Sequence, residues 1–107
     1  MGYTTRVAWE PLRSIDSATL SGSYQAVGTP LANPSYILKL VNNSSVLVTI
    51  SFDGVHDHDV APSMSFWLYD EDKTTFHEGL PAGTQIYVKG SAGTGLVYLV
   101  TQYLITQ

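Results

Sequence analysis

The stretch Val46-Leu47-Val48-Thr49-Ile50-Ser51-Phe52 decides the fold class of this chain. Its valines, isoleucine and phenylalanine occupy every second position, so in an extended chain they share one face while Leu47, Thr49 and Ser51 share the other. β-Branched residues favour strands because they pack well on a pleated surface. The stretch therefore predicts a β-strand with one buried face, and it places Phe52 in the core.

The same period of two returns in residues 64–69. We assign three of these side chains to the core face: Met64, Phe66 and Leu68. Trp67 and Tyr69 then point to the opposite face, as does Tyr87 in a later alternating segment. If that second face is uncovered, these aromatic residues are free to contact another molecule.

Turn signals rich in glycine, proline, asparagine and aspartate separate the alternating segments, as at Asp53-Gly54 and Pro81-Ala82-Gly83. The intervals between them predict strands near residues 5–10, 13–17, 23–27, 35–42, 46–52, 56–60, 64–69, 84–90 and 95–103, one of the first two being irregular. No window has the 3.6-residue period of a helix. The pattern predicts an all-β fold, an antiparallel β-sandwich of about eight strands with jelly-roll or Greek-key connections.

The last predicted strand differs from the others. Residues 95–103 are apolar on both faces, which predicts a central strand that is covered on both sides.

Length and cysteine content predict one domain that needs no disulfide. The chain has 107 residues, which is enough for a single core, and it has no cysteine. We expect residues 21–107 to form the β-sandwich domain. Residues 1–20 form either the first strands or an arm that reaches a neighbouring molecule. The arm is suggested by three residues suited to docking: Arg6, Trp9 and Arg13.

Charge argues against two classes of partner. The formal net charge is −4, whereas binding to nucleic acid or to an anionic membrane requires a basic face on the protein. Charged residues are only 13% of the chain, about half the usual share, which favours extensive contact with other proteins. No apolar run approaches the ~20 residues of a membrane span, and no basic and apolar leader suggests a signal peptide.

The segment from Asp53 to Asp59 offers the strongest metal-like motif. His56 and His58 are two residues apart, so on a strand they would face the same side and could share a zinc or nickel ion. A carboxylate or His77 would have to complete the site. Because Asp-Gly is a strong hairpin signal, we interpret the segment as a turn that leads into a strand, with no metal.

Catalytic motifs are absent from the sequence. There is no cysteine and no Gly-x-Ser-x-Gly elbow. The glycine-rich segment 90–95 leads into a predicted strand, whereas a phosphate loop must lead into a helix, so we expect a hairpin loop. We therefore predict no enzymatic activity, no catalytic residue and no cofactor.

The aromatic residues supply the best interface candidates: Trp9, Trp67, Tyr69 and Tyr87. Tryptophan and tyrosine are enriched at protein interfaces. The alternative is that a second sheet covers them and that they belong to the core. Few lysines or prolines protect the strand edges, so we also expect self-association.

Three stretches carry a family resemblance: VTISFDGVHDH at 48–58, LPAGTQIYVKG at 80–90 and GTGLVY at 93–98. Together they resemble small all-β virion proteins of tailed bacteriophages, several of which are capsid decoration (cement) proteins. The resemblance implies a structural protein that binds the major capsid protein or another virion protein. It also implies a place in the virion, assembled in the cytoplasm of the host bacterium.

Two alternatives stay open at this point. The motifs in the resemblance are structural, so a tail, neck or baseplate position fits them as well as a head position. A carbohydrate-binding β-sandwich module, which would use exposed tyrosine and tryptophan, is the candidate from another class.

Overall fold

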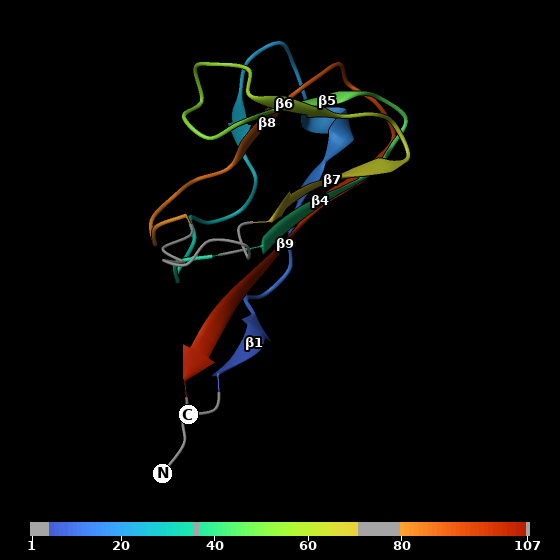
Figure 1. The fold of residues 1–107 in the computed structure, drawn as a ribbon. Coiled ribbons are helices and arrows are strands. Elements are labelled where there is room, and N and C mark those ends of the chain that lie inside the picture. The colour runs from blue at the N-terminus through green and yellow to red at the C-terminus, as the bar shows by residue number, and fades with distance from the viewer. Residues whose placement is uncertain (1–4, 36, 71–79, 107) are drawn as a thin grey trace.

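The computed structural model describes residues 5–35, 37–70 and 80–106. Two antiparallel β-sheets stack face to face in it, which confirms the predicted β-sandwich (Figure 1). The five-stranded sheet contains β1 (Thr5–Trp9), β2 (Arg13–Asp16), β4 (Ile37–Ser44), β7 (Ser65–Asp70) and β9 (Gly95–Thr106). The four-stranded sheet contains β3 (Gln25–Ala26), β5 (Val48–Ser51), β6 (Asp59–Ala61) and β8 (Tyr87–Lys89). One 3₁₀ turn, η1 (Ser17–Thr19), is the single helical element among the described residues.

The strand order is that of a jelly roll. The larger sheet runs β1-β9-β4-β7, with β2 also on β9, and the smaller runs β3-β8-β5-β6. Both β1 and β2 pair with the β9 edge that faces away from β4, so they act as one interrupted strand. Counted in this way, the eight described strands cross between the two sheets at every connection except the β5–β6 hairpin, as in a double Greek key.

The core lies between the sheets and consists of aliphatic side chains from both. The most deeply buried are Val27, Leu38, Leu40, Val48, Ile50, Ile86, Val88, Val97 and Leu99. The predicted core positions Val48 and Ile50 of β5 are confirmed, since both are completely buried, whereas Phe52 is half-buried against the core and Ser51, predicted on the other face, is buried as well. Each such side chain contributes roughly 1.5–3 kcal/mol through removal from water.

Strand β9 is central, as predicted, but it is covered on one face only. Val97, Leu99 and Thr101 are buried against the smaller sheet. Leu96, on the other face, keeps 37% of its surface exposed. The prediction of cover on both faces is therefore wrong, because an apolar residue in a strand need not be a buried one.

Strand β7 faces the opposite way from our prediction. Trp67 is paired with the buried Leu40, and cross-strand partners share a face, so its side chain is only 9% exposed. The indole Nε1–H donates to Asp59 Oδ2 at 2.6 Å, which satisfies its one polar atom. Phe66 consequently points outward and is 56% exposed, and the core assignment of Phe66, Met64 and Leu68 is wrong.

Strand β1 and the end of β9 continue beyond the sandwich as a two-stranded ribbon (Figure 1). The pairing runs from Trp9 opposite Gln102 to Thr5 opposite Thr106. Because β4 begins opposite Gln102, the last residues of β9 pair with β1 alone among the described strands. The ribbon contributes to the elongated shape of the molecule, which measures 53 × 24 × 22 Å.

Candidate functional site

The ribbon carries an exposed apolar strip. Val7 and Trp9 are two residues apart on β1, so they share one face, and both are exposed, Trp9 at 60%. Of the four aromatic interface candidates, Trp9 is thus the one that the fold presents openly to solvent.

A buried ion pair anchors the root of the ribbon. Arg13 Nη2 lies 2.7 Å from Glu10 Oε1, and both side chains are buried. Arg13 also donates from Nε to the carbonyl of Thr29 at 2.7 Å and from Nη1 to Thr101 Oγ1 at 3.1 Å. Asn33 donates to Glu10 Oε2 from its backbone N–H at 2.7 Å and from its side-chain amide at 2.9 Å.

This network corrects one expectation and has an electrostatic consequence. Arg13 is not available for docking, because its guanidinium is enclosed by its partners. Burial raises the pKa of the Glu10 carboxyl, but hydrogen bonds from Arg13 and Asn33 outweigh burial and hold that pKa below its usual value. The side chain of Arg6 lies outside the described residues.

Trp67 and Tyr69 belong to an aromatic cluster inside the molecule and at its margin. The rings of Phe52 and Trp67 are 5.8 Å apart, and those of Trp67 and Tyr69 are 6.4 Å apart. Trp67 is buried, and the half-buried Tyr69 packs against the core. The structure therefore places these two candidates where they stabilise the sandwich, which was the alternative considered for them.

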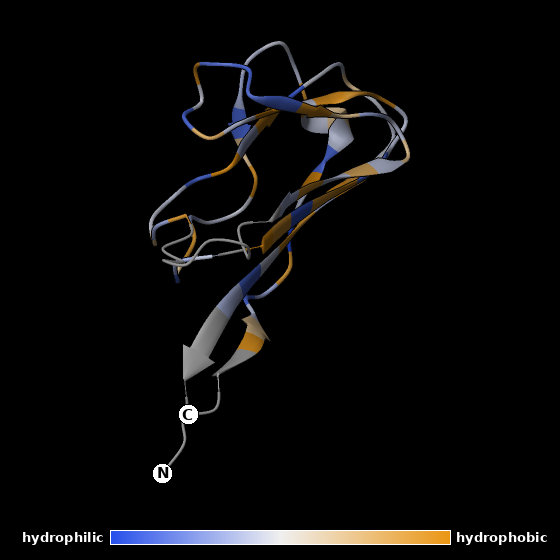
Figure 2. Ribbon diagram, viewed as in Figure 1, coloured by the Kyte–Doolittle hydropathy of each residue, from blue (hydrophilic) through white to orange (hydrophobic). Residues whose placement is uncertain are grey.

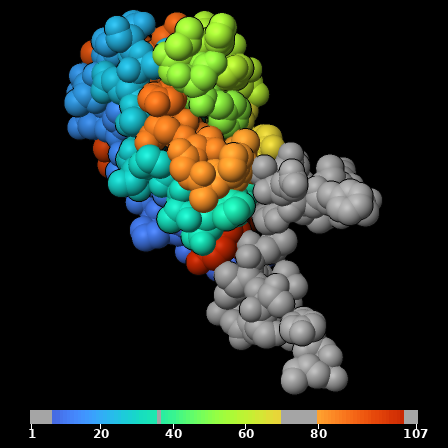
Figure 3. Space-filling model, turned by 90° about the vertical axis from the view of Figure 1, so that its left-hand side faces the viewer, coloured from blue at the N-terminus to red at the C-terminus, as the bar shows by residue number. Residues whose placement is uncertain are grey.

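Tyr87 supports the loop between β5 and β6. Gly54 has φ of +76° and lies so close to the Tyr87 ring that a Cβ there would be 3.4 Å from three of its carbons. The loop consequently covers part of the ring and leaves Tyr87 half-buried. Figure 2 colours much of this loop hydrophilic, and Figure 3 shows it, in yellow-green, against the orange β8 segment.

Asp53 organises that loop from within. Its Oδ1 accepts hydrogen bonds from the backbone N–H groups of Val55 and His56, both at 2.8 Å, and its Oδ2 lies 2.8 Å from His56 Nδ1. The pKa of Asp53 lies well below its usual range, and the hydrogen bond from the backbone N–H of His56 is the largest cause. The motif acts as a self-contained turn, and β6 begins after it, at Asp59.

The two histidines of the loop each direct one ring nitrogen to another residue of the same loop. Their ring centroids are 6.3 Å apart, and His58 Nδ1 accepts the backbone N–H of Phe52 at 3.0 Å. No group of three potential metal ligands occurs within residues 5–35, 37–70 and 80–106. His77 and most of the acidic run that starts at Asp70 lie outside the described residues.

A second polar cluster joins three residues that the sequence does not connect. The Tyr24 hydroxyl donates to Asp57 Oδ1, and Lys89 Nζ lies 3.0 Å from the same oxygen and 4.7 Å from the centre of the Tyr24 ring. Desolvation and the hydrogen bond to Asp57 raise the pKa of Tyr24 to about 12. The Tyr24 and Lys89 hydrogen bonds lower the pKa of Asp57.

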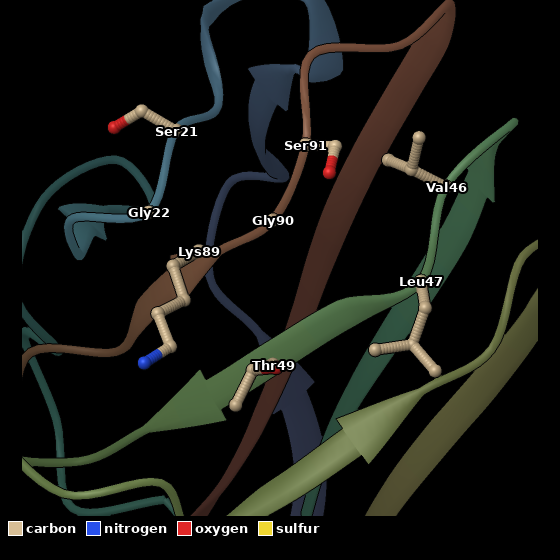
Figure 4. Close-up of a pocket in the computed structure, with 8 residues that line it drawn as sticks. All are labelled: Ser21, Gly22, Val46, Leu47, Thr49, Lys89, Gly90 and Ser91. Carbon is tan, nitrogen blue, oxygen red and sulfur yellow. The ribbon is translucent and has the colours of Figure 1, made fainter.

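A hollow with a volume of about 520 Å³ lies beside this cluster (Figure 4). Its lining comes from three chain segments: Ser21, Gly22, Val46, Leu47, Thr49, Lys89, Gly90 and Ser91. Lys89 is already paired with Asp57, and the lining includes no carboxylate, imidazole or aromatic ring. The hollow therefore offers neither a general acid or base nor a stacking platform for a sugar.

The outward face of the five-stranded sheet is strongly apolar, and sequence reasoning missed it by placing β7 the wrong way round. On the body of the sandwich, its exposed large apolar side chains are Met64, Phe66, Leu68 and Leu96. Lys39 Nζ lies 5.1 Å from the centre of the Phe66 ring, so a cation borders the patch.

Comparisons with known proteins return no relative. No protein-family model, no curated protein and no solved structure matches this chain. Among the described residues, no helix has the length and apolar character that crossing a membrane requires.

Proposed function

We propose that this protein is a structural component of a tailed bacteriophage particle, a capsid decoration protein that binds major capsid subunits without catalysing a reaction. The observation that carries the proposal is the projecting β1–β9 ribbon with Val7 and Trp9 exposed on it. An isolated two-stranded ribbon is at best marginally stable in water. One that displays large apolar side chains gains stability when a partner covers it.

The ribbon has the means to bind by two physical routes. Within the described residues, β1 pairs with β9 alone and the end of β9 pairs with β1 alone, so each strand has an outer edge whose backbone N–H and C=O groups can pair with an extended segment of a neighbour by β-augmentation. Trp9 supplies a rigid aromatic anchor of the kind that dominates interface energetics. The jelly-roll fold adds support, since viral capsid domains use it, although a fold by itself does not fix a function.

The described polar clusters fit a binding role better than a catalytic one. Glu10 with Arg13, Asp53 with His56, and Asp57 with Lys89 each hold two chain segments or one turn together. A catalytic group needs capacity left over for a substrate, and these groups direct theirs to neighbouring residues.

The test is cosedimentation of the purified chain with expanded heads assembled from the major capsid protein of the same genome. The wild-type chain should sediment with heads, and Trp9→Ser should weaken binding at least tenfold. Val55→Ser is the control, because Val55 is more exposed than Trp9 and lies on the distant β5–β6 loop. Absence of head binding by the wild-type chain would overturn the proposal, and binding to purified tails would move it to the tail, neck or baseplate.

A carbohydrate-binding function is the second candidate, and the exposed ring of Trp9 is the observation that favours it. The chain has two tryptophans, of which Trp67 is buried, so a ligand that stacks on Trp9 should change the more solvent-exposed part of the fluorescence. A saturable glycan-dependent change that disappears in Trp9→Ser would favour this candidate over capsid binding.

A further inference from the structure

We infer that the outward face of the five-stranded sheet binds the same face of a second copy of this chain, forming a two-fold symmetric dimer. The surface involved, called the outer patch, consists of Val41, Met64, Phe66, Leu68, Leu96 and Tyr98. The inference goes beyond the proposed function, since it uses a surface on the sandwich body and not the ribbon strip.

The outer patch is continuous across three strands. Val41 of β4 is paired with Phe66 of β7 on one side and with Tyr98 of β9 on the other, so the three side chains form a row. Lys39 is likewise paired with Leu68. The apolar side chains therefore form one surface and are not scattered singly, as ordinary exposed residues are.

Met64 occupies a backbone conformation that suits glycine or asparagine better. Its φ is +58°, in the left-handed region that costs most residues free energy, and its side chain is 70% exposed. The exposed side chain contributes little to the core. With Val41 and Phe66 it lines a shallow hollow of about 180 Å³, which another molecule can fill. A flexible methionine beside such a hollow is typical of binding surfaces.

The size of the patch fits a small interface. A large apolar side chain presents roughly 150–250 Å² when fully exposed, so the four most exposed residues together present on the order of 400 Å². That value is near the upper limit for one patch on a monomer. The half-buried Val41 and Tyr98 extend this area, which stays below the ~800 Å² per partner of a standard interface and therefore suits a weak dimer.

Charge around the patch favours a second copy over a charged partner. Lys39 and Asp16 border it, and both are exposed. In a two-fold interface every contact occurs twice in reciprocal form, so Lys39 can approach the partner's Asp16 on both sides of the axis. Three other carboxylates, those of Asp53, Asp57 and Asp59, belong to the opposite sheet and its loop.

The experiment is sedimentation equilibrium of the full chain from roughly 10 µM to 1 mM, a range suited to an interface at the small end of the size scale. The wild-type chain should dimerise, and Leu68→Asn should raise the dissociation constant at least tenfold, because the change acts in both subunits. Leu47→Asn is the matched control: Leu47 and Leu68 are 50% and 52% exposed, and Leu47 lies just before β5 in the opposite sheet.

Thermal melting of each variant separates loss of pairing from loss of folding, and Phe66→Asn repeats the test at a second position. A wild-type chain that stays monomeric throughout the range would overturn the inference, as would a dimer that only Leu47→Asn disrupts. Head binding is scored separately. Monomers that bind heads would refute the dimer alone, and dimers that ignore heads would refute the proposed function alone.

Discussion

Arg13 Nη2 and Glu10 Oε1 lie 2.7 Å apart in a place where the two side chains are only 7% and 3% exposed. The pair holds the segment between β1 and β2 against the loop around Asn33 and against Thr101 of β9. A charged contact that water cannot easily screen therefore ties the root of the ribbon to the sandwich.

The first prediction concerns this pair. Arg13→Met should lower the free energy of unfolding by about 3–5 kcal/mol, because it leaves the Glu10 carboxylate buried without its cation. Denaturant titration measures the loss. The double variant Glu10→Gln with Arg13→Met should lose clearly less than the two single losses together, and strict additivity would show that the pair is not coupled.

The second prediction is the pH dependence of stability. The folded-state pKa values of Glu10, Asp53 and Asp57 are all lowered. Their stabilising effect is therefore fully present above the unfolded carboxyl pKa of about 4, and it is lost as pH falls through the lower folded values.

Melting temperature should be nearly constant from about pH 7 to pH 5 and should decrease below about pH 4. Glu10→Gln should make the decrease shallower, since one of the three carboxyls no longer titrates. If the melting temperature of Glu10→Gln decreases below about pH 4 as steeply as that of the wild type, this role for Glu10 is contradicted.

The third prediction tests the packing of Gly28 on Arg13. Gly28 has φ of +66°, and a Cβ there would lie 2.8 Å from Arg13 Cγ. Gly28→Ala should therefore destabilise the protein by about 1–3 kcal/mol through backbone strain and displacement of the arginine. Gly22→Ala is the control, because its Cβ would meet no atom within 4 Å, and equal losses in both variants would refute the explanation.

The fourth prediction separates the two tryptophans. Trp67→Ala should cost about 3–5 kcal/mol because it empties a core position and leaves Asp59 without its indole donor. Trp9→Ala should change stability by no more than about 0.5 kcal/mol, since Trp9 is exposed. Chemical denaturation followed by circular dichroism gives both values, and a Trp67→Ala variant as stable as the wild type would contradict the inward orientation of β7.

The fifth prediction uses the backbone of Met64. Met64→Gly should fit φ of +58° without strain, and Met64→Asn should fit nearly as well, with a gain for Asn of about 0.5–1 kcal/mol in unfolding free energy. Met64→Val should lose stability, because β-branched residues tolerate this conformation worst. If all three variants melt alike, the positive φ does not carry the cost assigned to it.

Strand positions could be predicted from the sequence because the period of two is a local property. The predicted and observed positions of β5 and β7 agree within a few residues, and the turn between β5 and β6 follows Asp53-Gly54 as expected. The facing of β7 could not be predicted in the same way. Phe66 and Trp67 are both large and apolar, so the alternation is satisfied by either orientation, and the pairing with Leu40 decides between them.

For a similar reason, the contacts that build the candidate site could not be predicted from local sequence patterns. Tyr24, Asp57 and Lys89 come from three distant parts of the chain, and Asn33 reaches Glu10 across 23 residues. No periodicity links such residues before the sheets are stacked. The exposed position of Trp9 was accessible to sequence reasoning, whereas the burial of Arg13 required knowledge of its partners.

The pairing of Thr5 with Thr106 has a consequence for the order of folding during synthesis. Paired residues of the ribbon are 93 to 101 positions apart in the sequence, so the closure of the ribbon must wait until β9 has left the ribosome. β9 is also the strand that joins β1, β2 and β4 into one sheet. A chain cut short before β9 therefore lacks both the ribbon and the centre of its sheet, and under the proposed function such a product could not occupy a binding position meant for an intact copy.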